Sequence, residues 1–139
     1  MSPLLSIHAG VTLALVGLIW TIQVVHYPLF AQVGREAFPA YHRRHSQRIT
    51  WVVAPLMFAE LLTAGLLLFT GYRDACFLVS LPLLVFNWVS TGLIQIPLHT
   101  KLGAGFTPEI HSRLVATNWW RTSAWTLRGV LMLPGSVAT

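Results

Sequence analysis

Charged residues are scarce in this sequence. Asp, Glu, Lys and Arg make up 9% of its 139 residues, whereas hydrophobic residues make up 55% and the mean hydropathy is +0.65. A soluble domain usually has about 25% charged residues. The chain therefore lacks the polar surface that a globule in water needs, and we expect lipid to be its solvent.

Among the charged residues the acidic ones are fewer, since the chain has four Asp and Glu against nine Lys and Arg, which gives a net charge of +5. Such a basic balance is typical of proteins that bind nucleic acid. The sequence has no lysine-rich run, however, and most of its basic residues lie at the ends of apolar segments, where lipid headgroups attract them. We therefore expect the lipid bilayer as a partner, and no nucleic acid.

A single cysteine, Cys76, excludes an intramolecular disulfide and a site built from several cysteines. A glycine-rich phosphate loop, a Ser-His-Asp order and a dinucleotide fingerprint are also missing, so nothing supports nucleophilic hydrolysis or NAD chemistry. The first apolar run follows Met1 without a basic stretch or a convincing cleavage site, which favours a retained first helix over a signal peptide.

What the chain does have is four apolar segments, at about residues 7–25, 49–70, 75–98 and 114–133. A membrane span needs roughly 20 residues at a rise of about 1.5 Å each. The fourth segment is the least apolar and carries Asn118, Arg121 and Arg128, so we expect protein to enclose it. We expect Pro28 to end the first helix and residues 29–41 to form a short amphipathic helix at the membrane surface.

A stretch after the first segment recurs in the second half of the chain. A shift by the 69 residues that separate Pro28 from Pro97 also moves Leu29 onto Leu98, Gly34 onto Gly103, His42 onto His111 and Trp51 onto Trp120. We interpret the match as a duplication, with convergence on a membrane-like composition as the alternative. The predicted fold is an all-α integral membrane protein with a single domain over residues 1–139. It is a four-transmembrane-helix bundle of two parallel two-helix repeats, at about residues 1–70 and 71–139, with short interfacial linker helices.

The basic residues indicate an orientation. Six of them flank the first and third linkers, whereas Arg73 stands alone on the other side; the six are Arg35, Arg43, Arg44, Arg48, Lys101 and Arg113. Cytoplasmic loops are enriched in Lys and Arg. We therefore expect a bacterial inner-membrane protein with its first and third linkers in the cytoplasm and both termini extracytoplasmic.

Five histidines map to the cytoplasmic side of this layout, namely His26, His42, His45, His99 and His111. Neutral imidazole binds copper, iron, zinc and haem iron. His42 and His45 lie about one turn apart on a helix, a spacing that can chelate one metal. We predict a transition-metal or haem site formed by these five residues. The alternatives are interfacial histidines that bind headgroup phosphates and a proton pathway.

Two charges are predicted in the middle of the bilayer. The shift of 69 residues pairs Glu60 with Gly129, which puts Arg128 at nearly the depth of Glu60. An unpaired charge there costs about 3 kcal/mol on insertion scales. We predict a buried Glu60–Arg128 ion pair, which either locks two helices together or serves a substrate or proton.

Asn118, Arg121 and Trp125 fall on the inward side of the fourth segment. Polar groups of this kind hold membrane helices together through hydrogen bonds. Alternatively, the three residues line a pocket for a flat, lipid-soluble ligand such as a quinone or a porphyrin, with Trp125 as one wall.

The function favoured by the sequence is membrane redox chemistry or metal handling, with a lipid-soluble or membrane-delivered substrate. Whether the protein is an enzyme, as a metal- or haem-dependent oxidoreductase, stays open. One alternative is a non-catalytic subunit of a larger membrane complex that binds pigment or lipid. Another is a small transporter that uses the Glu60–Arg128 pair and works as a homodimer.

Overall fold

The computed structural model describes residues 2–137 of the chain and their side chains as far as Leu133. All of the regular structure in this part is helical. The elements are α1 (Pro3–Thr21), the π-helical turn η1 (Ile22–His26), α2 (Tyr27–Leu29), the 3₁₀ turn η2 (Phe30–Gln32), α3 (Phe38–Phe69), α4 (Ala75–Ser90), the π-helical turn η3 (Thr91–Gln95), α5 (Ile96–Gly103) and α6 (Pro108–Val137).

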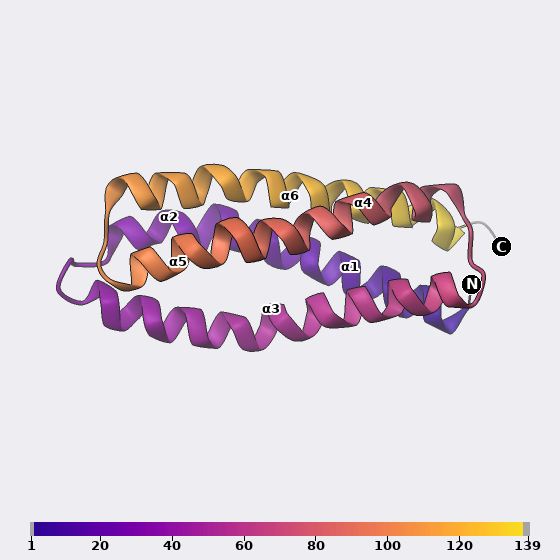
Figure 1. Ribbon diagram of the computed structural model, residues 1–139, viewed down its shortest axis with the longest axis horizontal. Coiled ribbons are helices and arrows are strands. Elements are labelled where there is room, and N and C mark those ends of the chain that lie inside the picture. Colours follow the sequence, from indigo (N-terminus) through magenta and orange to yellow (C-terminus); the bar gives the residue numbers. More distant parts are fainter. Residues whose placement is uncertain (1, 138–139) are drawn as a thin grey trace.

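These elements form four long rods that lie side by side (Figure 1). The first rod runs from α1 to η2, the second is α3, the third runs from α4 to α5, and the fourth is α6. α6 packs against both α1 and α4, and α3 packs against α1 and α5. The fold is therefore an antiparallel four-helix bundle with both ends of the chain at the same end of the molecule, which agrees with the predicted helix count.

Three of the rods are long and apolar enough to cross a membrane, namely Pro3–Gln32, Phe38–Phe69 and Ala75–Gly103. The fourth, α6, is less apolar because Asn118, Arg121 and Arg128 lie on its buried face. Trp120 and Val130 are exposed on its other face. Neighbouring helices thus enclose the polar stripe of α6, as the sequence indicated.

The expectation that Pro28 ends the first helix is wrong. Pro28 lies in the first turn of α2, directly after η1, where the Tyr27 N–H bonds to the carbonyl of Ile22. Proline lacks an N–H, and its ring clashes with the carbonyl four residues before it. The wider π turn redirects the backbone just ahead of the proline, so the helical path continues to Gln32.

The third rod repeats this arrangement. Pro97 lies in the first turn of α5, directly after η3, where the Ile96 N–H bonds to the carbonyl of Thr91. The two π turns begin 69 residues apart, at Ile22 and Thr91. This spacing is the same as that of the sequence match between the two halves.

The linkers are shorter than predicted. No separate helix forms over residues 29–41, because α2 and η2 extend the first rod and α3 already begins at Phe38. Pro39 stands in the first turn of α3, a position that suits proline since N–H groups there have no helical partner. As a result His42, His45 and Glu60 all belong to one continuous helix.

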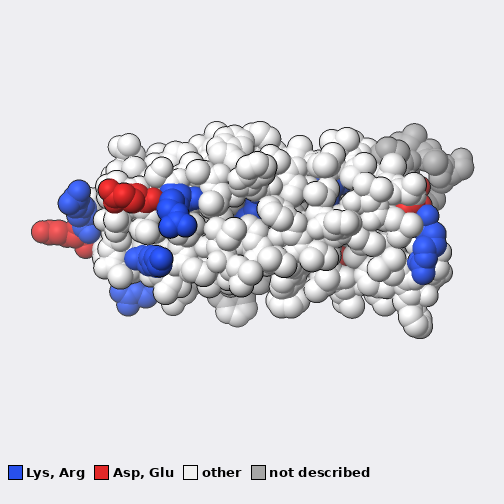
Figure 2. Space-filling model, turned by 45° about the horizontal axis from the view of Figure 1, so that its top comes forward, with Lys and Arg blue, Asp and Glu red and all other residues white. Residues whose placement is uncertain are grey.

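Charge divides the surface along the long axis. Figure 2 shows most Lys and Arg side chains at the end formed by η2, α5 and residues 33–37, and a broad band with few charged atoms across the middle. We call this basic end the histidine end, because it also holds His42, His99 and His111. The opposite end, which holds both termini, carries Arg73 and Asp74.

Candidate functional site

The structure brings the five predicted site histidines together around Phe30. The ring of Phe30 is fully buried, and its centroid lies 5.0 Å from that of His45 and 5.6 Å from that of His42. The rings of His99 and His111 lie 6.5 Å and 6.4 Å away. His26 joins the group through His45, at 5.4 Å between ring centroids. An aromatic side chain thus occupies the centre of the cluster.

Two of these histidines bind Tyr27, and a third, His42, joins them through His99. His99 Nε2 lies 2.9 Å from the Tyr27 hydroxyl, and His99 Nδ1 lies 3.0 Å from His42 Nε2. His111 donates from Nε2 to the backbone carbonyl of Tyr27 over 2.7 Å. A neutral imidazole donates through one nitrogen and accepts through the other, so both nitrogens of His99 are in use. These bonds join α2, α3, α5 and α6 at the histidine end.

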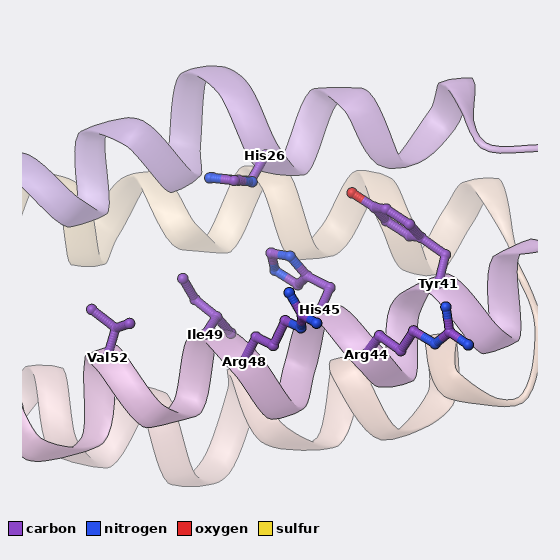
Figure 3. Close-up of a pocket in the computed structure, with 7 residues that line it drawn as sticks. All are labelled: His26, Tyr41, Arg44, His45, Arg48, Ile49 and Val52. Atoms are coloured by element: carbon purple, nitrogen blue, oxygen red, sulfur yellow. The ribbon is translucent and has the colours of Figure 1, made fainter.

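His26 and His45 form a different arrangement, in a surface groove between η1 and α3. The groove has a volume of about 540 Å³, and its other lining residues are Tyr41, Arg44, Arg48, Ile49 and Val52. Figure 3 shows the His26 and His45 rings facing one another across it, with both arginines on the side of α3. Nε2 of His45 is buried and has no hydrogen-bond partner among the described residues.

The described side chains do not form a metal centre by themselves. Among the residues that the structure describes, no three His, Cys, Asp or Glu side chains are arranged to hold a metal ion. Protein zinc sites take three or four such ligands. The predicted set of His26, His42, His45, His99 and His111 thus converges at one end but divides into a bonded group around Tyr27 and a pair at the groove.

Glu60 and Arg128 lie in the interior, and they are paired. Arg128 Nε is 3.0 Å from Glu60 Oε1, and both side chains are almost completely buried. Thr12 also donates to Oε1, at 3.0 Å, and Trp125 donates from Nε1 to Oε2, at 3.2 Å. The carboxylate therefore accepts bonds from three side chains on two neighbouring helices.

The other nitrogens of Arg128 have partners too. Nη1 donates to the carbonyl of Ser80 at 2.7 Å and to its hydroxyl at 3.2 Å, and Nη2 lies 3.4 Å from His8 Nε2. His8 Nδ1 in turn bonds to the Thr63 hydroxyl at 2.8 Å. No role was predicted for His8. The available signal was its spacing from Thr12, because residues four positions apart on a helix share one face.

The predicted cofactor-binding residues are neighbours in the packed interior. Asn118 donates to Gln23 at 2.8 Å, and Arg121 Nη1 donates to Asn118 Oδ1 at 2.9 Å. The Arg121 guanidinium lies 5.1 Å from the centroid of the Trp125 ring, within cation–π range. The bond between Asn118 and Gln23 links η1 to α6.

Comparison of the chain with protein-family models, with curated proteins and with solved structures finds no match. No family therefore supplies roles for these residues. Their function has to be inferred from the geometry and chemistry of the groove and of the buried polar clusters.

Proposed function

We propose that this chain is an integral membrane protein that binds haem in the groove between η1 and α3 and serves membrane redox chemistry. One observation carries the proposal: His45 Nε2 is buried without a partner, in a groove that also holds His26 and two arginines. His45 would hold the haem iron through this nitrogen, and His26 lies beside it.

Haem suits this groove better than a bare metal ion does. A porphyrin supplies four nitrogen ligands itself, so the protein needs to provide only one or two axial ligands, and histidine is a common one. A bare copper, iron or zinc ion needs three or more side chains, which do not meet in the described part of the chain. Iron held in this way supplies one-electron chemistry.

The rest of the groove matches the other parts of a haem. Arg44 and Arg48 lie on its α3 side, and guanidinium groups bind carboxylates such as the haem propionates with paired hydrogen bonds. Ile49 and Val52 provide an apolar wall for the macrocycle. A volume of about 540 Å³ falls in the range of about 300–1,000 Å³ that is usual for sites of this kind.

Membrane insertion and the duplication belong to the same proposal. Three rods have the length and hydropathy of membrane spans, and the band with few charged atoms in Figure 2 fits a hydrocarbon layer. The basic histidine end would face the cytoplasm, and both termini would lie outside. The equal offset of the two π turns supports two parallel repeats. A reporter fused to the C-terminus should be active only outside the cytoplasm, and activity only inside would invert the layout.

Haem binding is tested by titrating the detergent-purified protein with haemin and recording the visible spectrum. We expect one haem per chain, with a shifted Soret band. His45→Ala should remove most of the binding, and His26→Ala should weaken it. The controls are His42→Gln and His8→Gln, whose ring nitrogens bond within the protein, and both should still bind haem.

The other outcomes separate the competing ligands. A Soret shift that survives His45→Ala would refute the proposed ligand. If haem does not bind but elemental analysis finds stoichiometric copper, iron or zinc, the bare-metal alternative replaces haem. If neither binds and phospholipid phosphate copurifies through Arg44 and Arg48, the groove is a headgroup site and the subunit alternative is favoured. The transporter alternative has less support, because the Glu60–Arg128 cluster is closed by its own hydrogen bonds.

A further inference from the structure

The two buried arginines of α6 have very different surroundings. Arg128 pairs with Glu60, whereas Arg121, only 4% exposed, has no carboxylate within ion-pair distance in the described part of the chain. Its Nη1 donates to Asn118, and its Nε is buried without a hydrogen-bond partner. A buried cation without a counter-charge is strongly destabilising. A negative partner beside Arg121 would offset this cost.

α4 supplies further unpaired polar atoms. Asn87 is completely buried, and both its amide nitrogen and its amide oxygen lack partners. Ser90, which is 3% exposed, has an unpaired hydroxyl on the same side of the helix. The large majority of buried side-chain polar atoms in proteins have a partner, so unpaired atoms of this kind point to a bound water molecule or ion.

Two hydrogen bonds set the register between α4 and α6. At one end the carbonyl of Ser80 accepts a bond from Arg128, and at the other end Gln95 donates to the hydroxyl of Thr117. The two helices are antiparallel and rise equally per residue. Between these two contacts, Asn87 and Ser90 therefore lie level with residues 118–125 of α6, the stretch that contains Arg121.

We infer that this layer between α4 and α6 binds a small monovalent anion of halide size. The Arg121 Nε–H, the Asn87 Nδ2–H and the Ser90 hydroxyl are all hydrogen-bond donors, and the layer carries one uncompensated positive charge. An anion satisfies the donors and the charge together. A water molecule bound with it would donate to Asn87 Oδ1, the acceptor that the anion leaves unpaired.

The Tyr27 phenol is the competing source of negative charge. It interacts with Arg121 both electrostatically and as a side-chain hydrogen-bond partner, and its hydroxyl also bonds to His99. An ionised Tyr27 would make an anion unnecessary, and it would show the ultraviolet absorption of a phenolate. The experiment has to separate these two sources.

The test is the thermal unfolding of the detergent-purified protein in sodium bromide and in sodium gluconate at equal ionic strength. A ligand that binds only the folded state raises Tm with a saturating dependence on its concentration. We expect such a rise with bromide and none with gluconate, whose anion is too large. In Arg121→Gln the half-effective bromide concentration should increase at least tenfold. In the control Arg113→Gln, which changes an exposed arginine of the same helix, it should stay the same.

If Arg121→Gln does not fold, Asn87→Leu and Ser90→Ala replace it, and each should raise the half-effective bromide concentration several-fold. Anomalous scattering from bromide in crystals should place the ion beside Arg121. An equal bromide response in the wild type and in the folded variants would mean a general salt effect and an adventitious ion only, which overturns the inference. So would a phenolate absorption at neutral pH in a wild type whose Tm does not respond to bromide. Neither result bears on haem binding in the groove.

Discussion

The Glu60–Arg128 cluster and the His26–His45 groove both use titratable side chains, but they use them in opposite ways. In the cluster, the carboxylate and the guanidinium are buried together and each has several hydrogen-bond partners. At the groove, Arg44 and Arg48 are exposed, and His45 Nε2 is buried without a partner. A closed network has no group left for a ligand. An unpaired donor or acceptor beside an opening is what a binding site requires.

The largest effect is expected from breaking the ion pair. Glu60→Gln or Arg128→Met alone should lower the free energy of unfolding by about 3–5 kcal/mol, because the remaining charge stays buried without its partner. The double variant Glu60→Leu with Arg128→Met should recover much of this loss. Denaturant unfolding in detergent measures all three. If the double variant loses as much free energy of unfolding as the two single variants together, the two residues do not interact. The cluster would then not be the closed network that distinguishes it from the groove.

A smaller effect is expected at the bonded histidines. His42→Ala leaves His99 Nδ1 without its partner and opens space beside Phe38, which should cost about 2 kcal/mol of stability. Haem affinity, measured by titration and corrected for the fraction of unfolded protein, should change less than about twofold. His45→Ala should have the opposite effect: it should remove most of the haem binding and lower the free energy of unfolding only slightly. If a well-folded His42→Ala lost haem, the site first predicted from all five histidines would be favoured over the groove.

A substitution of Thr12 tests whether each hydrogen bond to the Glu60 carboxylate contributes to stability. Thr12→Val keeps the shape of the side chain and removes one of the bonds to the carboxylate, so the free energy of unfolding should fall by about 1.5 kcal/mol. Thr50→Val is the matched control, since the hydroxyl of Thr50 is exposed and bonds only to the backbone of its own helix. Thr50→Val should lower the free energy of unfolding by no more than about 0.5 kcal/mol. Equal losses in the two variants would show that Glu60 does not depend on Thr12.

The smallest effect concerns the exposed arginines of the groove. Arg44→Gln and Arg48→Gln should each weaken haem affinity by a few-fold, or about 1 kcal/mol or less, because exposed ion pairs are weak in water. Added salt should reduce the difference from the wild type, since salt screens exposed charges. Arg35→Gln, which lies outside the groove, serves as the control in the same titration. An Arg35→Gln loss as large as the others would indicate a general charge effect and no specific contact.

Several features of this bundle could be predicted because they depend on local composition. The apolar runs indicate the helices, and the polar stripe of α6 indicates that other helices enclose it, since lipid offers no partner for Arg121 or Arg128. The offset between the two halves placed Glu60 and Arg128 at one depth, where they lie 3.0 Å apart. Pro28 misled the prediction, because the π turn before it lets the helix continue, and a π turn leaves no pattern in the side chains.

Which histidines are free was decided only by the tertiary structure. By sequence, His42, His45, His99 and His111 are alike, because each lies near the same end of an apolar segment. Tyr27 and Phe30 separate them: the first bonds to His99 and His111, and the second fills the space that a shared metal ion would need. A ring nitrogen of these histidines is bonded only where a partner atom on another helix lies within about 3 Å of it, and otherwise it is free. Such a distance depends on how whole helices pack against one another, and the order of residues along one helix does not determine that packing.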